Sequence, residues 1–314
     1  MPQATVVKGT RGEYSRYSRW VTEIIAAKAP LFEKASIDEF YLDLTGMDRY
    51  FNPWQWTIDL RQEIIDKTGL PISFALAANK MIAKIATNEA KPNGYMQVPP
   101  DMGKAFLSPL PVNTIPGIGT QTYRHLLLMG MQTIGDVAFR KPADLEFFLG
   151  NYGLELWNKA NGIHHGDVIP YHEAKSVSTE NTFETSSTDM DFIISELVRM
   201  TERVSYELRQ DDKMAGCIAV KIRYPDFETT SRQTVIAYTC YDDELIPAAK
   251  ALFYKLYRKG HPVRLLGVRL SELTGEARQT NLFEDAEKKT GLYEAIDAVK
   301  GRFGKKAISR ARTV

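Results

Sequence analysis

The chain has 314 residues, of which 44% are hydrophobic and 25% charged, and its formal net charge is +1. This length exceeds the usual size of one domain, so two or three compact units are expected. Two cysteines without a CxxC pair or a histidine cluster argue against a disulfide scaffold or a zinc site. The N-terminus has no apolar signal core and no stretch approaches membrane-spanning length, so we expect a cytoplasmic protein without membrane contact.

The small net charge hides segregated charges. Residues 189–212 carry seven acids against three arginines, whereas residues 286–314 carry eight bases against three acids. Charge separated in this way favours a polyanionic partner.

The first hundred residues alternate between helical and strand patterns. Apolar residues at helical spacing predict helices over 12–28, 53–67 and 80–90, and short alternating or aliphatic runs predict strands over 35–44, 71–77 and 95–98. Such alternation indicates an α/β or α+β unit.

Asp38 and Glu39 are adjacent acids within the strand predicted over 35–44. Alternation along a strand would place Asp38 at the end of the core-facing row of Phe40 and Leu42. A buried carboxylate must be protonated, paired or bound to a cation, and a metal ion would satisfy this pair. The alternative is a solvated acid at a strand end, and both acids reach one ion only at a strand edge or bulge.

The Pro-rich residues 107–111 mark a boundary, after which an all-helical unit extends to about His165. Within it, Pro116-Gly117-Ile118-Gly119 is typical of a helix-hairpin-helix turn. Glycines at 117 and 119 would let backbone N–H groups at the next helix reach a DNA phosphate. The alternative is a simple glycine C-cap between two helices.

Residues 166–174 are interpreted as a linker to a third unit. Its predicted strands and helices cover 175–183, 190–210, 217–224, 229–239, 243–258 and 263–273. This β-α-β-β-α-β order predicts an antiparallel sheet with both helices on one side. Basic residues on the open face are expected to hold a phosphate backbone, unless the face is merely solvated: Lys221, Arg223, Arg232, Arg264 and Arg269.

Three motifs in this order and spacing resemble a Y-family translesion DNA polymerase of the DinB, or DNA polymerase IV, type. They are residues 36–43 around Asp38 and Glu39, residues 79–94 ending in Lys-Pro-Asn-Gly, and residues 116–119. The resemblance runs through nearly the whole chain. It implies a partial polymerase palm over 1–100, a helix-hairpin-helix thumb over 101–165, and a β-α-β-β-α-β little finger over 175–275.

The resemblance also implies site residues and partners. Asp38 and Glu39 would be ligands of two catalytic Mg²⁺ ions, Lys91 would meet the triphosphate of the incoming nucleotide, and Ser36 would face the primer end. Carboxylates and a cation must converge in such nucleotidyl transfer. Primer-template DNA and deoxynucleoside triphosphates are the expected substrates of a monomeric enzyme.

A further family feature lies in the C-terminal segment, residues 276–314. Gln279-Thr280-Asn281-Leu282-Phe283 resembles the peptide by which bacterial polymerases bind the sliding clamp. Gln279 is a polar anchor, and Leu282 and Phe283 are suited to a partner's pocket. The remaining basic tail is either an additional DNA-binding arm or a solubilising extension.

Compared with the family, the chain starts after the first palm strand with its metal-binding Asp and after the fingers. Loss of a metal ligand should remove most of the rate enhancement. The leading hypothesis is a template-directed DNA polymerase of this family, although we therefore expect that the chain on its own does not polymerise. The alternative function is a noncatalytic DNA- and clamp-binding protein.

Overall fold

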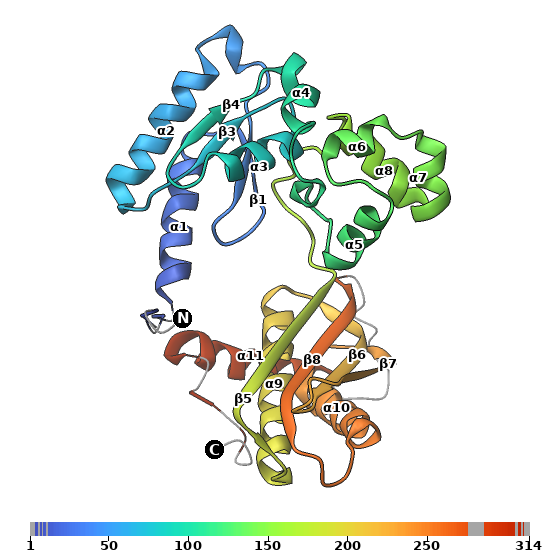
Figure 1. Ribbon diagram of the computed structural model, residues 1–314. Helices are drawn as coiled ribbons and strands as arrows, with labels where there is room; N and C mark the ends of the chain where they lie inside the picture. Colours follow the sequence, from blue (N-terminus) through green and yellow to red (C-terminus); the bar gives the residue numbers. More distant parts are fainter. Residues whose placement is uncertain are drawn as a thin grey trace. The chain divides into compact units, whose positions relative to one another are not determined.

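The computed structural model describes residues 12–275 and 286–304, together with residues 4, 5, 7, 9, 10, 307, 308 and 310. The chain divides into two compact units, Met1–His172 and Glu173–Val314. Both contain helices and strands, which confirms the expected α+β class (Figure 1). Within the described residues, no helix combines the length and apolar character that a membrane crossing requires.

In the first unit, two helices pack on a β-hairpin. The helices are α1 (Glu13–Ala26) and α2 (Pro53–Thr68), and the strands are β1 (Leu31–Lys34) and β2 (Phe40–Asp43). Ile24 and Ile25 of α1 meet Ile64 of α2 in a shared core, against which Phe32 of β1 and Leu42 of β2 pack. The helical pattern at 12–28 and 53–67 therefore predicts both helices correctly.

A second, separate pair of strands follows in the same unit. Strand β3 (Phe74–Leu76) pairs in parallel with β4 (Tyr95–Gln97), and α3 (Lys80–Glu89) connects them. Asn79 begins α3 because its side chain accepts a hydrogen bond from the Ile82 amide at 3.0 Å. This helix carries the lysines that contact the hairpin.

The rest of the first unit is helical, as predicted. Its helices are α4 (Gly103–Leu107), α5 (Thr120–Leu128), α6 (Ile134–Phe139), α7 (Pro142–Leu149) and α8 (Asn151–Ala160), with 3₁₀ turns at Met47–Arg49, Pro100–Met102 and Val112–Thr114. Leu107, Leu126 and Leu156 share a core with Ile82 and Ile85 of α3. The helices after residue 103 thereby share one hydrophobic core with α3.

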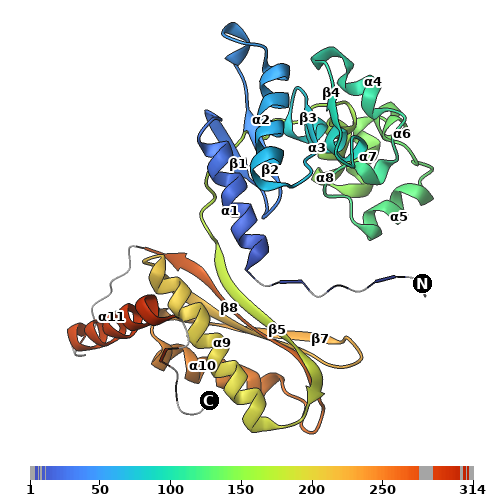
Figure 2. The ribbon, with the colours of Figure 1, turned by 90° about the vertical axis from the view of Figure 1, so that its left-hand side faces the viewer.

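The second unit has the predicted β-α-β-β-α-β order. Its elements are β5 (Ser176–Ser187), α9 (Met190–Gln210), β6 (Met214–Arg223), β7 (Thr229–Thr239), α10 (Asp242–Leu256) and β8 (Val263–Thr274). The sheet order is β5-β8-β6-β7 and every pairing is antiparallel. Buried residues such as Ile218, Val220 and Leu266 pack against α9 and α10, which lie on the same face of the sheet (Figure 2).

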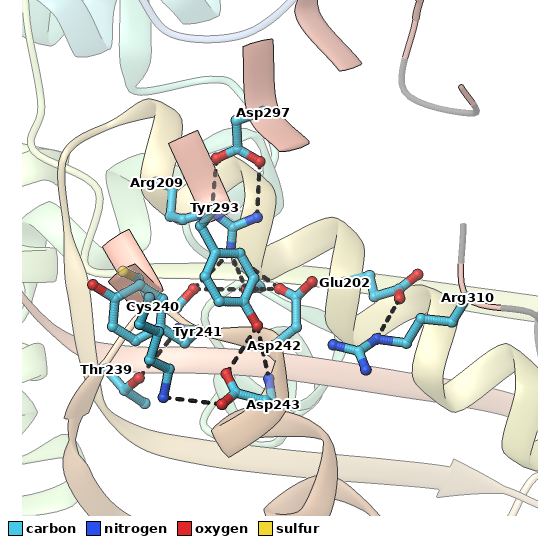
Figure 3. A network of polar contacts seen from close by, with 12 residues as sticks. Glu202, Arg209, Thr239, Cys240, Tyr241, Asp242, Asp243, Tyr293, Asp297 and Arg310 are labelled. Carbon is cyan, nitrogen blue, oxygen red and sulfur yellow. Dashed lines mark hydrogen bonds and ion pairs between the residues drawn. The ribbon is translucent and has the colours of Figure 1, made fainter. Parts of the chain in front are cut away.

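A further helix, α11 (Ala286–Phe303), packs on this unit mainly through polar groups. Arg209 of α9 lies between Asp242 and Asp297, with nitrogen-to-oxygen distances of 3.0 and 2.7 Å (Figure 3). Its guanidinium also lies 4.7 Å from the centre of the Tyr293 ring. Burial by itself would lower the pKa of Arg209, but the hydrogen bonds to Asp297 and Asp242 raise it, so the side chain stays charged.

Basic residues of the C-terminal segment pair within the second unit. Lys289 lies 3.0 Å from Asp243, Arg310 lies 3.0 Å from Glu202, and Lys300 is buried at 7% exposure. Helix α11 is therefore a structural part of the unit, and whether its basic residues also contact DNA stays a prediction. Because acidic and basic segments meet within the chain, their segregation does not by itself indicate a polyanionic partner.

Candidate active site and DNA-binding face

Asp38 and Glu39 lie in the turn between β1 and β2, so the prediction of a strand over 35–44 is wrong at its start. The strands pair only as far as Lys34 and Phe40. The Ser36 hydroxyl donates to Asp38 Oδ1 at 2.6 Å, and its amide donates to the Glu39 carbonyl at 3.2 Å. Such local bonds compete with strand pairing. Asp38 is consequently exposed and does not end a core-facing row.

Two lysines one turn apart on α3 hold this hairpin. Lys84 forms an ion pair with Glu39, and Lys80 Nζ donates to Glu33 Oε2 at 2.5 Å. Their four-residue spacing places both side chains on the same face of the helix. The acids of the turn are thereby fixed relative to α3.

Glu33 is a buried acid with several donors around it. Burial by itself would raise the pKa of Glu33, but the Lys80 ammonium and the Ile169 amide, 2.9 Å away, donate hydrogen bonds to its carboxylate. His172 Nε2 lies 3.7 Å from the other carboxylate oxygen. The pKa of Glu33 therefore lies below its usual range, and the group is ionised in the folded protein.

Lys91 is exposed immediately after α3, in the Lys-Pro-Asn-Gly turn. A Cβ atom on Gly94 would lie 2.1 Å from the Ala90 carbonyl oxygen, so only glycine fits this position. Arg61 Nη2 donates to the Asn93 carbonyl at 2.9 Å. These contacts fix the Asn93–Gly94 end of the turn, and within the described residues Lys91 makes no ion pair.

Asp38 and Glu39 alone supply only some of the ligands that a hard cation needs. The described residues contain no group of three or more His, Cys, Asp or Glu side chains that could hold a metal ion. Mg²⁺, however, is commonly held by one or two carboxylates together with substrate phosphates and water. Asp38 and Glu39 therefore fit a site in which a bound nucleotide supplies further ligands.

The predicted glycine turn is present before α5. Gly117 has φ 95°, in the left-handed region that favours glycine, while Gly119 has an ordinary φ of −82° and precedes the helix directly. No atom lies within 4 Å of a Cβ added at either glycine. The 3₁₀ turn Val112–Thr114, rather than an α-helix, leads into the turn.

The sheet of the second unit has an open face opposite α9 and α10. Alternation along β6 places Lys221 and Arg223 on this face, because Ile222 between them is fully buried. Arg269 of β8 shares the face, since it pairs with Ala219 of β6, two residues from Lys221. A hollow of about 320 Å³ on this face is lined by groups that include Lys221, Arg269 and Glu180.

Arg232 and Arg264 do not share this face, so that part of the prediction is wrong. Arg232 pairs with the core residue Val220, and Arg264 is two residues before the fully buried Leu266. Alternation therefore directs both arginines to the helix-covered side, at its margins. The prediction placed both arginines on the open face from their positions along the strands. The face is instead decided by how each strand pairs with its neighbour. Whether they contact DNA stays a prediction.

Sequence reasoning missed the partners of three lysines. The spacing of Lys80 and Lys84 was visible, but the acids that they bind are more than forty residues away and are reached only through the fold. Likewise, nothing in the sequence indicates that Glu180 meets Lys221. The proposed clamp residues Gln279, Leu282 and Phe283 lie outside the described residues.

Comparison with known families gives two matches that together cover most of the chain. The impB/mucB/samB family matches residues 1–88, and the C-terminal domain of the same family matches residues 174–282. A DNA polymerase IV of Dehalococcoides mccartyi strain 195 is 33% identical over 315 residues, covering 99% of this chain and 81% of the relative. The DNA polymerase IV of Halorhodospira halophila is 34% identical over 287 residues, covering 90% of this chain and 80% of the relative.

Solved structures agree with this similarity. A chimera of the Y-family DNA polymerases Dbh and Dpo4 matches with a TM-score of 0.76 at 25% identity, covering 86% of this chain and 79% of the chimera. DinB from Sulfolobus solfataricus matches with a TM-score of 0.55 at 26% identity, covering 86% of this chain and 80% of that one. The fold and these relatives define a DNA-directed DNA polymerase. The chain belongs to the Y family and is of the DinB, or DNA polymerase IV, type.

Proposed function

We propose that this chain serves template-directed DNA synthesis in damage tolerance, by nucleotidyl transfer to a primer 3′-hydroxyl. In that reaction the 3′-oxygen bonds to the α-phosphorus of a deoxynucleoside triphosphate, and pyrophosphate leaves. The observation that carries the proposal is the β1–β2 turn, which presents Asp38 to solvent beside Glu39 in a chain of this family.

Each residue of the turn region has a role in this proposal. Asp38 and Glu39 would hold two Mg²⁺ ions together with the nucleotide phosphates. When bound, these ions stabilise charge on the phosphoryl oxygens and the leaving pyrophosphate. Ser36 orients the Asp38 carboxylate through its 2.6 Å hydrogen bond and faces the primer end. Lys91, exposed after α3, contributes a positive charge toward the triphosphate.

The rest of the chain would hold DNA and the replication machinery. We assign 1–100 to part of the palm, 101–165 to the thumb, 166–174 to a linker and 175–275 to the little finger. The boundary between compact units after His172 falls inside the proposed linker and supports it. Gly117 and Gly119 would contact a DNA phosphate at the turn before α5, and the open sheet face would contact the backbone elsewhere.

The C-terminal segment 276–314 would recruit a partner protein. Its residues Gln279, Leu282 and Phe283 have the chemistry of a short peptide that inserts two apolar side chains into a pocket of a sliding clamp. We propose that the protein binds the clamp and DNA as a monomer.

Binding of a metal–nucleotide complex tests the proposed site whether or not the chain extends primers. Mn²⁺ in place of Mg²⁺ allows its binding, with a deoxynucleoside triphosphate and primer-template DNA, to be followed by electron paramagnetic resonance. Asp38→Asn and Glu39→Gln keep the side-chain shapes and should each abolish this binding. The matched control is Asp43→Asn, which removes a carboxylate from the other end of β2, where Asp43 accepts a bond from the Thr45 amide.

Primer extension then separates the two candidate functions. A catalytic chain extends the primer and loses this activity with Asp38→Asn. A noncatalytic DNA- and clamp-binding protein binds primer-template DNA but gives no extension under any metal condition. Unchanged metal–nucleotide binding in both acid variants would show that the turn is not the metal site.

A further inference from the structure

Glu180 and Lys221 form an ion pair that crosses an intervening strand. Glu180 on β5 pairs with Gly267 on β8, and Gly267 in turn pairs with Lys221 on β6. With neighbouring strands about 4.8 Å apart, the two backbones are separated by roughly 10 Å. The side chains therefore meet above Gly267, on the open face of the sheet.

Gly267 makes this contact sterically feasible. A Cβ atom at this position would lie 2.9 Å from Glu180 Cγ, closer than side chains pack. Gly267 is absent from the residues with positive φ, so its backbone conformation does not itself require glycine. The missing side chain is what gives the Glu180 carboxylate room to lie across β8 toward Lys221.

The surroundings of this pair are those of an anion site. The hollow above Gly267 is also lined by Ser178, Ser231, Gln233 and Arg269. Arg269 Nη2 donates to Gln233 Oε1 at 3.3 Å, which keeps the guanidinium at the edge of the hollow. Hydroxyl, ammonium and guanidinium donors are the groups that bind phosphate oxygens of DNA. Within the paired row Glu180, Gly267, Lys221 and Ser231, the single anionic group is the Glu180 carboxylate.

We propose that the Glu180 carboxylate occupies the place of a DNA backbone phosphate in the free protein and withholds Lys221 from nonspecific DNA. The inference rests on the proposed DNA-binding role of this face. DNA must exchange one of its phosphates for the carboxylate before Lys221 contributes to binding. The ion pair thus lowers the affinity of the face for DNA but leaves the other basic side chains of the face available.

A salt titration of DNA binding tests this exchange. Affinity for a primer-template duplex is measured by fluorescence anisotropy at several salt concentrations for wild type, Glu180→Gln, Lys221→Met and the double variant. Each phosphate contact contributes about 0.9 to the slope of log affinity against log salt. Glu180→Gln should therefore bind about three- to tenfold more tightly at moderate salt and steepen the slope by about 0.9. Lys221→Met alone should change DNA affinity by less than about twofold, because Glu180 already keeps Lys221 from the DNA.

Two comparisons make the result specific. The control variant Glu228→Gln removes the same charge from the ion pair of Glu228 with Arg258. These two side chains are 45% and 46% exposed, similar to the Glu180–Lys221 pair, and the control should leave DNA affinity unchanged. In the Lys221→Met background, Glu180→Gln should no longer raise the affinity for DNA. A gain that persists in that background, or one that Glu228→Gln reproduces, would overturn the proposal, since simple repulsion between acid and DNA would then explain it.

The Arg269→Gln variant separates failure of this inference from failure of the proposed DNA face. If Arg269→Gln weakens binding and lowers the salt slope while Glu180→Gln behaves like Glu228→Gln, the face binds DNA and only the exchange is wrong. If Arg269→Gln and every variant of the pair leave binding unchanged, the open face is not the DNA surface and both proposals fail.

Discussion

Lys80 Nζ lies 2.5 Å from Glu33 Oε2, and this ion pair joins the first turn of α3 to strand β1. Both side chains are largely buried, at 19% and 10% exposure. Removing one partner of a buried pair leaves the other charge without compensation. The placement of the Asp38 and Glu39 turn against α3 therefore depends on a residue that has no part in the proposed chemistry.

Lys80→Met should lower the free energy of unfolding by about 3 kcal/mol, near the lower limit for a broken buried pair because both groups keep some contact with water. The urea-induced unfolding transition of the first unit measures this free energy. Lys67→Met is the control, since Lys67 is 54% exposed in its pair with Glu63 and should cost less than about 1 kcal/mol. Equal losses for the two variants would contradict a special role for Lys80.

The same pair predicts a pH dependence of stability. The folded-state pKa of Glu33 is depressed, so its stabilising contribution is complete above the unfolded pKa and is lost as pH falls through the folded pKa. Unfolding free energies of wild type and Glu33→Gln, measured from neutral to acid pH, should therefore converge as the solution is acidified. A difference that stays constant with pH would show that Glu33 has the same pKa in both states.

Arg209 should determine whether α11 stays packed on the second unit. Arg209→Met leaves Asp242 and Asp297 buried without their shared cation, at 6% and 12% exposure, which should cost about 3–5 kcal/mol. Hydrogen exchange followed by mass spectrometry should show faster exchange in 286–304. Arg203→Met removes a 61% exposed arginine from the same helix and should leave that exchange unchanged.

The clamp peptide gives a prediction that is independent of catalysis. Leu282→Ala together with Phe283→Ala should reduce affinity for the sliding clamp at least tenfold, because two apolar anchors lose their pocket contacts. Surface plasmon resonance with immobilised clamp measures this, and unchanged clamp affinity in the double variant would rule out the peptide assignment. DNA binding by the same variant should stay at the wild-type value.

Local patterns in the sequence predicted most elements, but they missed strand β1 and helix α11 and did not decide the sheet face of every strand residue. The helical spacing of Ile193, Leu197, Val204 and Leu208 predicts α9 at its observed bounds, because one apolar stripe of a helix must face the sheet. The alternation around Ile222 likewise assigns Lys221 and Arg223 to the open face. Arg232 was misplaced because its face follows from pairing with Val220 on another strand.

The residues of the candidate site come from the sequence and stay a prediction, whereas their geometry comes from the structure. Asp38 and Glu39 were proposed as adjacent acids, but their strand was extended too far because the hydrogen bonds of Ser36 that close the turn are not visible in an apolar-polar pattern. The ion pairs of Lys84 with Glu39 and of Glu180 with Lys221 join distant segments. Such contacts depend on tertiary packing and carry no local signal.

The measurement that tests the account most directly is Mn²⁺–deoxynucleotide binding to the primer-template complex, compared between wild type and the Asp38→Asn, Glu39→Gln double variant. The account predicts that the double variant loses this binding, and with it any primer extension that the wild type shows, while its affinity for DNA is unchanged. Retention of metal–nucleotide binding by the double variant would contradict the assignment of the β1–β2 turn as the polymerase metal site.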